Sequence, residues 1–284
     1  MSTAAIPIVS SIAALADTSE AWIVDIWGVM HNGARAFAAA GEACRTFRAR
    51  GGFVVLLSNA PRPFSAVIGH MASLGVDSAT YDTGVTSGDA TRGMVEAWSG
   101  RKLLHIGPER DKGLFAGLDV TLVPAEDADA IVCSGLWDDT KETPDDYAAL
   151  FDRLVAHGLP MICANPDLVV ERGDRLIHCA GALAAAYAAK GGAVTYAGKP
   201  HLPIYERTFD VIDELKGRPV PKARIIAIGD GLDTDLKGAH AAGLRSVLVA
   251  SAVHLPGGLD QRALAEAFAS RPFRPVAAMT ALAW

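Results

Sequence analysis

The sequence is poor in several features that mark particular classes of protein. Its 284 residues hold only four cysteines, and none of them forms a Cys-x-x-Cys pair. Cys44, Cys133, Cys163 and Cys179 lie in or directly after apolar sequence, so we expect four buried reduced thiols rather than a metal site or a disulfide framework. A formal net charge of -6, without a dense Lys/Arg patch, gives no electrostatic basis for binding nucleic acid.

Long apolar runs are also absent. The longest candidate, residues 182–189, is too short to cross a bilayer, so we expect no membrane association. The first 17 residues contain Pro7 and lack the basic segment of a signal peptide, which indicates a cytoplasmic protein. An apolar content of 50% with a charged content of 20% is typical of a fully folded globular chain.

The sequence does contain apolar runs that end in acid. Residues 22–24 lead into Asp25, and residues 225–229 lead into Asp230. Each run is typical of a buried parallel strand with a carboxylate at its C-terminal tip, where open α/β sheets bind ligands. Asp235 follows closely, so at least three carboxylates gather at one end of the sheet. Because carboxylates repel one another unless a cation lies between them, the pattern predicts a divalent-metal site.

Strand and helix patterns alternate along the chain, which predicts an α/β fold with a Rossmann-like parallel sheet. The strand candidates are residues 22–25, 53–57, 102–106, 130–133, 161–164, 193–197, 224–228 and 246–249. The stretch between Ser58 and Lys199 is far longer than one crossover needs, and its middle has a βα pattern of its own. We therefore expect residues 1–84 and 194–284 to form a core and residues 85–193 to form an inserted α/β cap.

Four short motifs follow one another along the chain, at residues 25–29, 58–59, 198–200 and 229–235. Each is a weak signal alone, but in this order, with a large insertion between the second and the third, they resemble the four motifs of the haloacid dehalogenase (HAD) superfamily, class IIA. That class includes nucleotide, 4-nitrophenyl phosphate and pyridoxal phosphate phosphatases. The resemblance implies a Mg²⁺-dependent hydrolase, a phosphatase acting on a small phosphorylated metabolite.

The resemblance also implies a metal centre. Asp25 would be the catalytic nucleophile that attacks phosphorus and becomes an aspartyl phosphate. Asp25, Asp230 and Asp235 would bind Mg²⁺ together with the backbone carbonyl of Trp27, since hard oxygen donors suit that ion.

The remaining motif positions would bind the substrate. Ser58 and the backbone N–H of Asn59 would contact the phosphoryl oxygens near a helix start, and Lys199 would neutralise the nucleophile and the transferring group. The turn at residues 164–167 is similar to one that class IIA caps carry, so Asn165 and Asp167 are substrate-binding candidates. Caps of this type often make dimer contacts in the family, which points to a homodimer.

One position departs from the family pattern. The phosphatases carry a second aspartate two residues after the nucleophile as general acid/base, but this chain has Trp27, whose indole can only donate a hydrogen bond. The missing proton transfer is worth about 10²–10⁴-fold in rate. Three interpretations stay open. The first is a phosphatase that is slow or restricted to good leaving groups such as acyl or aryl phosphates. In the second, the catalytic role passes to His31, which lies in a segment that Gly28 and Gly33 are expected to loosen and make flexible. The third is a protein that binds a phosphorylated ligand or partner without turnover.

Two other families with similar sheets are excluded. A response-regulator receiver also presents Asp, Ser/Thr and Lys at strand tips, but it needs a paired acid early in the chain and is less than half this length. A P-loop NTPase needs the pattern Gly-x-x-x-x-Gly-Lys-Ser/Thr, which this sequence lacks.

Overall fold

The computed structural model describes residues 5–172, 175–250, 255 and 257–284. Contacts between residues group the chain into two compact units. The first unit comprises residues 1–58, 68–85 and 205–284, and the second comprises residues 59–67 and 86–204.

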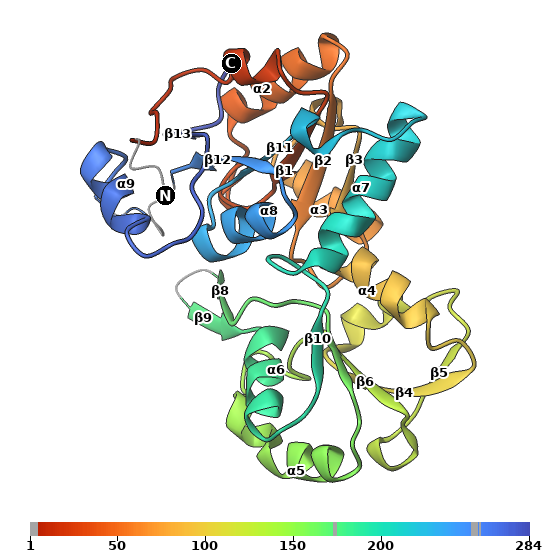
Figure 1. Cartoon of the computed structure of the whole chain (residues 1–284). Coiled ribbons are helices and arrows are strands. Elements are labelled where there is room, and N and C mark those ends of the chain that lie inside the picture. Colours follow the sequence, from red (N-terminus) through yellow and green to blue (C-terminus); the bar gives the residue numbers. More distant parts are fainter. Residues whose placement is uncertain (1–4, 173–174, 251–254, 256) are drawn as a thin grey trace. The chain divides into compact units, whose positions relative to one another are not determined.

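The first unit is built on a six-stranded sheet with the order β13-β12-β11-β1-β2-β3 (Figure 1). Its strands are β1 (Ala21–Asp25), β2 (Phe53–Ser58), β3 (Thr83–Thr86), β11 (Ile225–Gly229), β12 (Arg245–Val249) and β13 (Ala277–Met279). Central β1 pairs in parallel with both β2 and β11. The order in which strands are added reverses between β1 and β11, which is the point where doubly wound sheets bind their ligands.

The helices of this unit accompany a sheet whose two central strands, β1 and β11, are almost entirely apolar. They are α1 (Ala13–Ala16), α2 (Ala38–Ala49), α3 (Phe64–Ser73), α7 (Leu202–Lys216), α8 (Lys237–Ala241) and α9 (Gln261–Ala267), with 3₁₀ turns at Ser78–Thr80 and Lys222–Arg224 and a π-helical turn at Leu232–Leu236. Every residue of β1 and of β11 is buried, which explains why both read as continuous apolar runs. On one side of β1, Trp22 stacks on Phe47 of α2 with ring centroids 3.9 Å apart.

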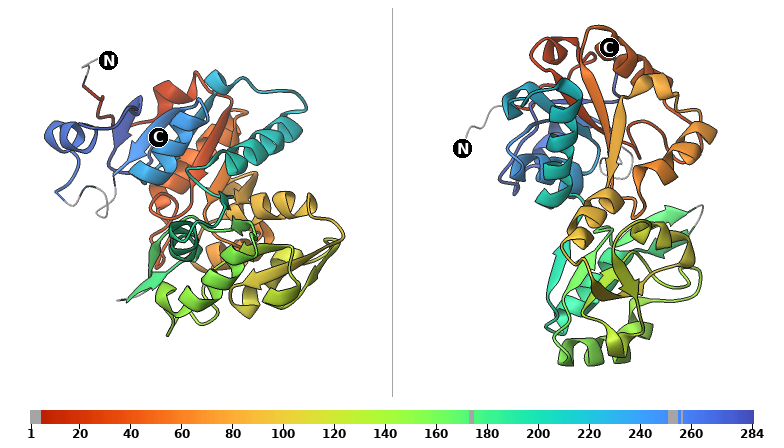
Figure 2. Two further views of the ribbon diagram at one scale, coloured as in Figure 1. Left: turned by 60° about the horizontal axis from the view of Figure 1, so that its bottom comes forward. Right: turned by 90° about the vertical axis from the view of Figure 1, so that its right-hand side faces the viewer.

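The second unit contains a five-stranded sheet with the order β10-β7-β6-β4-β5, drawn in yellow, green and teal in Figure 2. Its strands are β4 (Arg101–Ile106), β5 (Val120–Leu122), β6 (Ala130–Cys133), β7 (Met161–Cys163) and β10 (Val194–Tyr196), and its longer helices are α4 (Ser87–Glu96), α5 (Ala148–Ala156) and α6 (Ala180–Ala189). Short 3₁₀ segments span Glu109–Phe115, Ala125–Asp127 and Pro144–Tyr147, and an antiparallel hairpin joins β8 (Val169–Arg172) to β9 (Arg175–His178). In this sheet the order in which strands are added reverses between β4 and β6.

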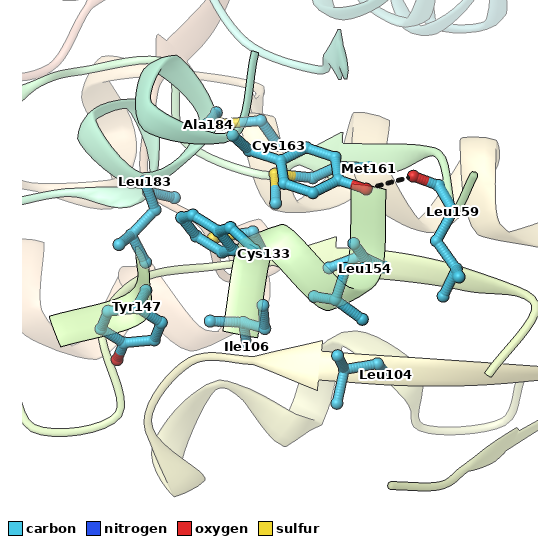
Figure 3. Packing of buried hydrophobic residues seen from close by; sticks show 14 of the residues in the cluster. Leu104, Ile106, Cys133, Tyr147, Leu154, Leu159, Met161, Cys163, Leu183 and Ala184 are labelled. Carbon is cyan, nitrogen blue, oxygen red and sulfur yellow. Dashed lines mark hydrogen bonds between the residues drawn. The ribbon is translucent and has the colours of Figure 1, made fainter. Parts of the chain in front are cut away.

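Side chains of the second sheet alternate between two buried clusters. Leu104, Ile131 and Met161 belong to a cluster with α5 and α6. The adjacent residues Leu103, Val132 and Ile162 pack in a second cluster that includes Val95 of α4. Figure 3 shows the first cluster, in which the Tyr187 hydroxyl donates a 2.6 Å hydrogen bond to the Leu159 carbonyl. Burial on both faces is the usual state of a parallel sheet, and it gives this unit a core of its own.

The predicted α/β class with parallel sheets is confirmed, and all four cysteines are buried thiols. The second sheet ends later than expected, because Val194–Tyr196, which lies beyond the expected boundary at residue 193, pairs with Met161–Cys163. Whether residues 85–193 fold as an independent insertion stays a prediction. Among the described residues, no helix combines the length and the apolar character that a membrane span requires.

Candidate active site

Three carboxylates meet at the carboxyl end of the first sheet. Asp25 is the last residue of β1, Asp230 directly follows β11, and Asp235 lies in the π-helical turn that comes next. One oxygen from each side chain lies within 4.8 Å of the other two. The three residues are only 7%, 9% and 6% exposed, so bulk water screens their mutual repulsion poorly.

Two glycines allow this close approach. Gly28 has a φ of +85°, and a Cβ built on it would collide with the Asp230 carboxylate. A Cβ on Gly229, the last residue of β11, would collide with Cβ and Cγ of Asp235. The sequence suggested that Gly28 loosens its loop, but its role is to give the backbone room beside an acid. A glycine three residues after a strand-tip acid is the signal that could have revealed this role.

The Asp235 side chain is held by its own turn. The Gly231 N–H donates to Asp235 Oδ2 at 3.1 Å, and the Leu236 N–H donates to the Gly231 carbonyl at 3.0 Å. The Tyr205 hydroxyl donates to the Asp235 backbone carbonyl at 3.2 Å. π-Helical turns are rare and are concentrated at functional sites, and this one aims a carboxylate toward the tip of β1.

The donors present fit a hard divalent cation. Asp25, Asp230 and Asp235 supply carboxylate oxygens, which Mg²⁺ prefers. Trp27 directly precedes Gly28, whose backbone lies against Asp230, so the Trp27 peptide is next to the acids. A cavity of ≈10 Å³, about the space for one water, is lined in part by Asp25 and Asp235.

Ser58 ends β2, which pairs in parallel with β1. Its neighbour Leu57 is the register partner of Asp25, so the tips of β1 and β2 are adjacent. Ser58 is partly buried. The first unit therefore brings Asp25, Ser58, Asp230 and Asp235 to one edge of its sheet.

The other predicted substrate-binding residues form a second cluster, which belongs to the second unit. The Lys199 N–H donates to Asn59 Oδ1 at 2.7 Å, and Asn59 Nδ2 donates to the Lys199 carbonyl at 3.1 Å and to Asp167 Oδ1 at 2.8 Å. The Asp167 N–H in turn donates to Asn165 Oδ1 at 3.0 Å. Lys199 is 4% exposed. The side-chain amide of Asn59 thus hydrogen-bonds to both the N–H and the carbonyl of Lys199.

Two further residues belong to this cluster: Gly198, which the sequence placed in the third motif without a role of its own, and Ser87, which sequence reasoning missed. A Cβ on Gly198 would approach Asn59 Oδ1 to 2.5 Å and Ser87 Oγ to 2.7 Å, so only glycine fits before the lysine. Ser87 is fully buried, and its hydroxyl is among the buried polar atoms of the described residues that make no hydrogen bond. Nothing in the sequence distinguished this serine from an ordinary residue at a helix start.

His31 and Trp27 lie in the loop after β1. His31 is 3% exposed, and its Nδ1 accepts a 3.0 Å hydrogen bond from the Gly33 N–H. Burial, followed by the charge of His70, lowers the pKa of His31 below its ordinary value. The loop that was expected to be flexible is closed by hydrogen bonds, which favours a structural role for His31. Its catalytic role stays a prediction.

Comparisons with known proteins agree with this geometry. A family profile described as haloacid dehalogenase-like hydrolase matches residues 22–121, and one described as HAD-hydrolase-like matches residues 196–276. A crystal structure of a haloacid dehalogenase-like hydrolase from Brucella suis 1330 is 43% identical, with a TM-score of 0.84 over 97% of this chain and 100% of that one. The chain belongs to the haloacid dehalogenase-like hydrolases.

Two further relatives of this HAD chain are more distant. The D-glycerol 3-phosphate phosphatase of Mycobacterium tuberculosis is 30% identical over 251 residues, which cover 84% of this chain and 65% of that protein. The 4-nitrophenylphosphatase structure from Thermotoga maritima shares the fold, with a TM-score of 0.72, 24% identity and coverage of 94% and 96%. The chain thus spans just under two thirds of the length of the first of these relatives. The predicted resemblance to class IIA HAD proteins is confirmed.

Proposed function

We propose that this HAD protein is a Mg²⁺-dependent phosphatase of small phosphomonoesters that uses Asp25 as its nucleophile. The observation that carries the proposal is the meeting of Asp25, Asp230 and Asp235, whose oxygens lie within 4.8 Å of one another at the point where the winding of the sheet reverses. A buried set of carboxylates needs a counter-charge, and a cation bound there would also attract a phosphate group. The phosphatase names of the curated relatives support the same reaction class.

The chemistry follows from the positions of the acids. An oxygen of Asp25 forms a bond to phosphorus while the bond from phosphorus to the leaving oxygen breaks, and water then hydrolyses the aspartyl phosphate to restore Asp25. Mg²⁺, when bound, would neutralise the charge on the acids and on the phosphoryl oxygens. Asp230 and Asp235 would hold the ion, and the Trp27 carbonyl would complete the protein's share of its ligands.

The remaining roles are also part of the proposal. Ser58 and the Asn59 N–H would bind phosphoryl oxygens, and Lys199 would balance the charge of the transferring group. Asn165 and Asp167 would shape the substrate side of the site, within an inserted cap at residues 85–193 that excludes water and selects the ester. We further propose that the protein acts in the cytoplasm as a homodimer.

A second function is favoured by one observation. Trp27 stands where the family's phosphatases carry their general acid/base, and an indole cannot transfer the proton. A protein with an intact metal site and no proton transfer could bind a phosphorylated ligand without hydrolysing it.

Phosphate release distinguishes these two functions. The purified protein would be assayed on a panel of phosphomonoesters and one acyl phosphate, with Mg²⁺ or with EDTA, beside Asp25→Asn and the control Asp233→Asn. Asp233 lies in the same motif, but its side chain is 73% exposed and pairs with Arg271. We expect Mg²⁺-dependent turnover that Asp25→Asn abolishes and Asp233→Asn preserves. Absence of turnover in the parent protein on every ester would overturn the phosphatase.

A further inference from the structure

Trp27 is exposed, whereas the three acids of the site are buried. Its side chain is 51% exposed, two residues after the proposed nucleophile Asp25. Asp25, Asp230 and Asp235 are each less than 10% exposed. A large apolar ring in contact with solvent beside a buried polar site is available to a ligand, whereas a ring that only fills space would be covered.

The indole is held in one position by its own loop. A Cβ on Gly33 would collide with the far edge of the Trp27 ring, so the indole lies directly against the Gly33 backbone, which has a φ of +83°. The ring of His31 meets the indole nearly perpendicularly, with centroids 5.4 Å apart and an interplanar angle of 79°. His31 meets His70 in the same way at 6.3 Å. Contacts on these sides leave the remaining indole surface to solvent.

Backbone hydrogen bonds fix the loop that carries these rings. The Gly28 N–H donates to the His31 carbonyl at 2.8 Å, and the Met30 and His31 N–H groups donate to the Ile26 carbonyl at 2.9 and 3.2 Å. The Gly33 N–H bond to His31 Nδ1 adds a side-chain contact. An aromatic side chain fixed before the ligand arrives loses little conformational entropy on binding, which makes it an effective stacking surface.

The chemistry of the indole selects the kind of leaving group. Without a general acid, an alkoxide must leave unprotonated, which costs about 10²–10⁴-fold in rate. A phenolic oxygen, with a pKa of about 10 against roughly 16 for water, leaves with its electron pair far more readily. The same phenolic group is flat and can stack on an exposed indole. Trp27 therefore disfavours esters that need protonation and offers a binding surface to esters that do not.

We infer that Trp27 is a specificity-determining residue whose fixed indole stacks on the leaving group of the substrate, and that the preferred substrates are aryl phosphates. The inference rests on the proposed function. In the step it describes, an Asp25 oxygen bonds to phosphorus, the bond from phosphorus to the aryl oxygen breaks, and the aryloxide keeps the electron pair. Water then attacks the phosphorus of the aspartyl phosphate, which releases inorganic phosphate, frees the Asp25 carboxylate and passes one proton to solvent.

Kinetics on matched esters test the specificity. The values of kcat/KM for phenyl phosphate, 4-nitrophenyl phosphate and glycerol 3-phosphate would be compared in the parent protein, Trp27→Phe, Trp27→Ala and Trp27→Asp. We expect the parent to favour phenyl phosphate over glycerol 3-phosphate by at least about 100-fold. Trp27→Ala should raise KM for the aryl esters about tenfold, Trp27→Phe should restore most of that loss, and Trp27→Asp should gain at least about tenfold on glycerol 3-phosphate. Equal use of the two ester classes by the parent would overturn the inference.

A binding measurement separates this inference from the proposed function. Calorimetry with Mg²⁺ would compare phenylphosphonate with methylphosphonate, neither of which the proposed reaction cleaves. We expect phenylphosphonate to bind about tenfold more tightly to the parent and the two ligands to bind equally to Trp27→Ala. If no ester is hydrolysed but this ratio persists, the phosphatase fails and the stacking role stands. A ratio near one in the parent contradicts the stacking role, whatever the activity.

Gly33→Ala provides a variant that keeps the tryptophan. Its Cβ would displace the indole, so we expect the phenyl-to-methyl ratio to fall as in Trp27→Ala. Gly51→Ala is the matched control, because Gly51 also has a positive φ, +87°, but has no atom within 4 Å of a built Cβ. Loss of the ratio in both variants would attribute it to backbone strain and contradict the specific role of the Gly33 contact.

Discussion

In each of the two sheets, the order in which strands are added reverses at one point, between β1 and β11 in the first sheet and between β4 and β6 in the second. The side chains at these two reversal points differ. In the first sheet, Asp25 and Asp230 follow β1 and β11, and with Asp235 they place three carboxylates within 4.8 Å. In the second sheet, β4 and β6 flank the reversal, and His105 Nε2 lies 2.9 Å from Ser134 Oγ. The first point gathers like charges, whereas the second carries a hydrogen-bonded pair of different chemistry.

The titratable groups at the second point are shifted toward their neutral forms. Burial, assisted by the charge of Lys112, lowers the pKa of His105 to about 4. Burial raises the pKa of Asp111, although a hydrogen bond with Ser134 opposes that rise. The comparison shows that strand order provides a place for a ligand, while the side chains decide whether that place demands a counter-charge. Only the first point does so.

Among the substitutions considered, Gly28→Ala should have the largest effect, and it acts on the three acids at the reversal point of the first sheet. A Cβ at Gly28 collides with the Asp230 carboxylate, so we expect Mg²⁺ affinity and phosphate release to fall at least about tenfold. Stability should also fall by about 1–2 kcal/mol, because φ is +85°. Calorimetric Mg²⁺ titration and chemical unfolding measure the two effects. Gly51→Ala should show the stability loss alone, and a parallel loss of Mg²⁺ affinity there would contradict the account.

His105, at the reversal point of the second sheet, should make the stability of the protein depend on pH. His105 has a folded pKa of about 4 against 6.5 for its ordinary value, so its contribution is complete above pH 6.5 and is lost as pH falls toward 4. The loss amounts to about 3 kcal/mol in the free energy of unfolding. Chemical unfolding between pH 7 and 4 should show this slope, and His105→Gln should reduce it. His157→Gln, at an exposed histidine of the same unit, is the matched control for the substitution.

Gly107→Ala should perturb packing at the second point without affecting the metal. A Cβ there would collide with Ser134 Oγ and lie 2.7 Å from His105 Nε2, so we expect a loss of about 1–3 kcal/mol in the free energy of unfolding. Mg²⁺ affinity should equal that of the parent. Gly113→Ala, with no atom within 4 Å of its Cβ, should change stability by less than about 0.5 kcal/mol. A drop in Mg²⁺ affinity in Gly107→Ala would contradict the claim that the metal site depends on the first sheet alone.

The smallest effect is expected for an ordinary surface charge. Arg262 Nε lies 2.9 Å from Glu266 Oε1 on α9, and both side chains are well exposed. Glu266→Gln should lower the free energy of unfolding by less than about 0.5 kcal/mol, because solvent screens the pair. Chemical unfolding at low and high salt would measure the change. A loss above about 1 kcal/mol would contradict the expectation that solvent screens this exposed ion pair.

The sequence predicted the strands and acids of the first sheet well. The apolar runs before Asp25 and Asp230 are long and uninterrupted, and parallel strands bring their carboxyl ends to one edge, so the meeting of the acids follows from pattern alone. The same reasoning could not place the end of the second sheet. Val194–Tyr196 is short and only partly apolar, and its pairing with β7 depends on tertiary contacts.

Local roles were harder to predict than positions. Asn59 was expected to offer its backbone to a phosphate, and the sequence could not show that its side chain grips the backbone of Lys199, a residue 140 positions away. Gly28 and Gly33 were interpreted as loosening a loop, yet each allows a close approach that only coordinates reveal. Trp27 was understood as a loss of function at one position, and its contacts with Gly33 and His31 add a fixed and exposed surface.

The central claim is that the acids at the first reversal form a divalent-metal site. Calorimetric titration of Mg²⁺ into the parent protein, Asp230→Asn and the control Asp233→Asn tests it directly. We predict one Mg²⁺ site in the parent, affinity at least about tenfold weaker in Asp230→Asn, and unchanged affinity in Asp233→Asn. Equal Mg²⁺ affinity in the parent and Asp230→Asn, or no binding in the parent, would contradict the claim.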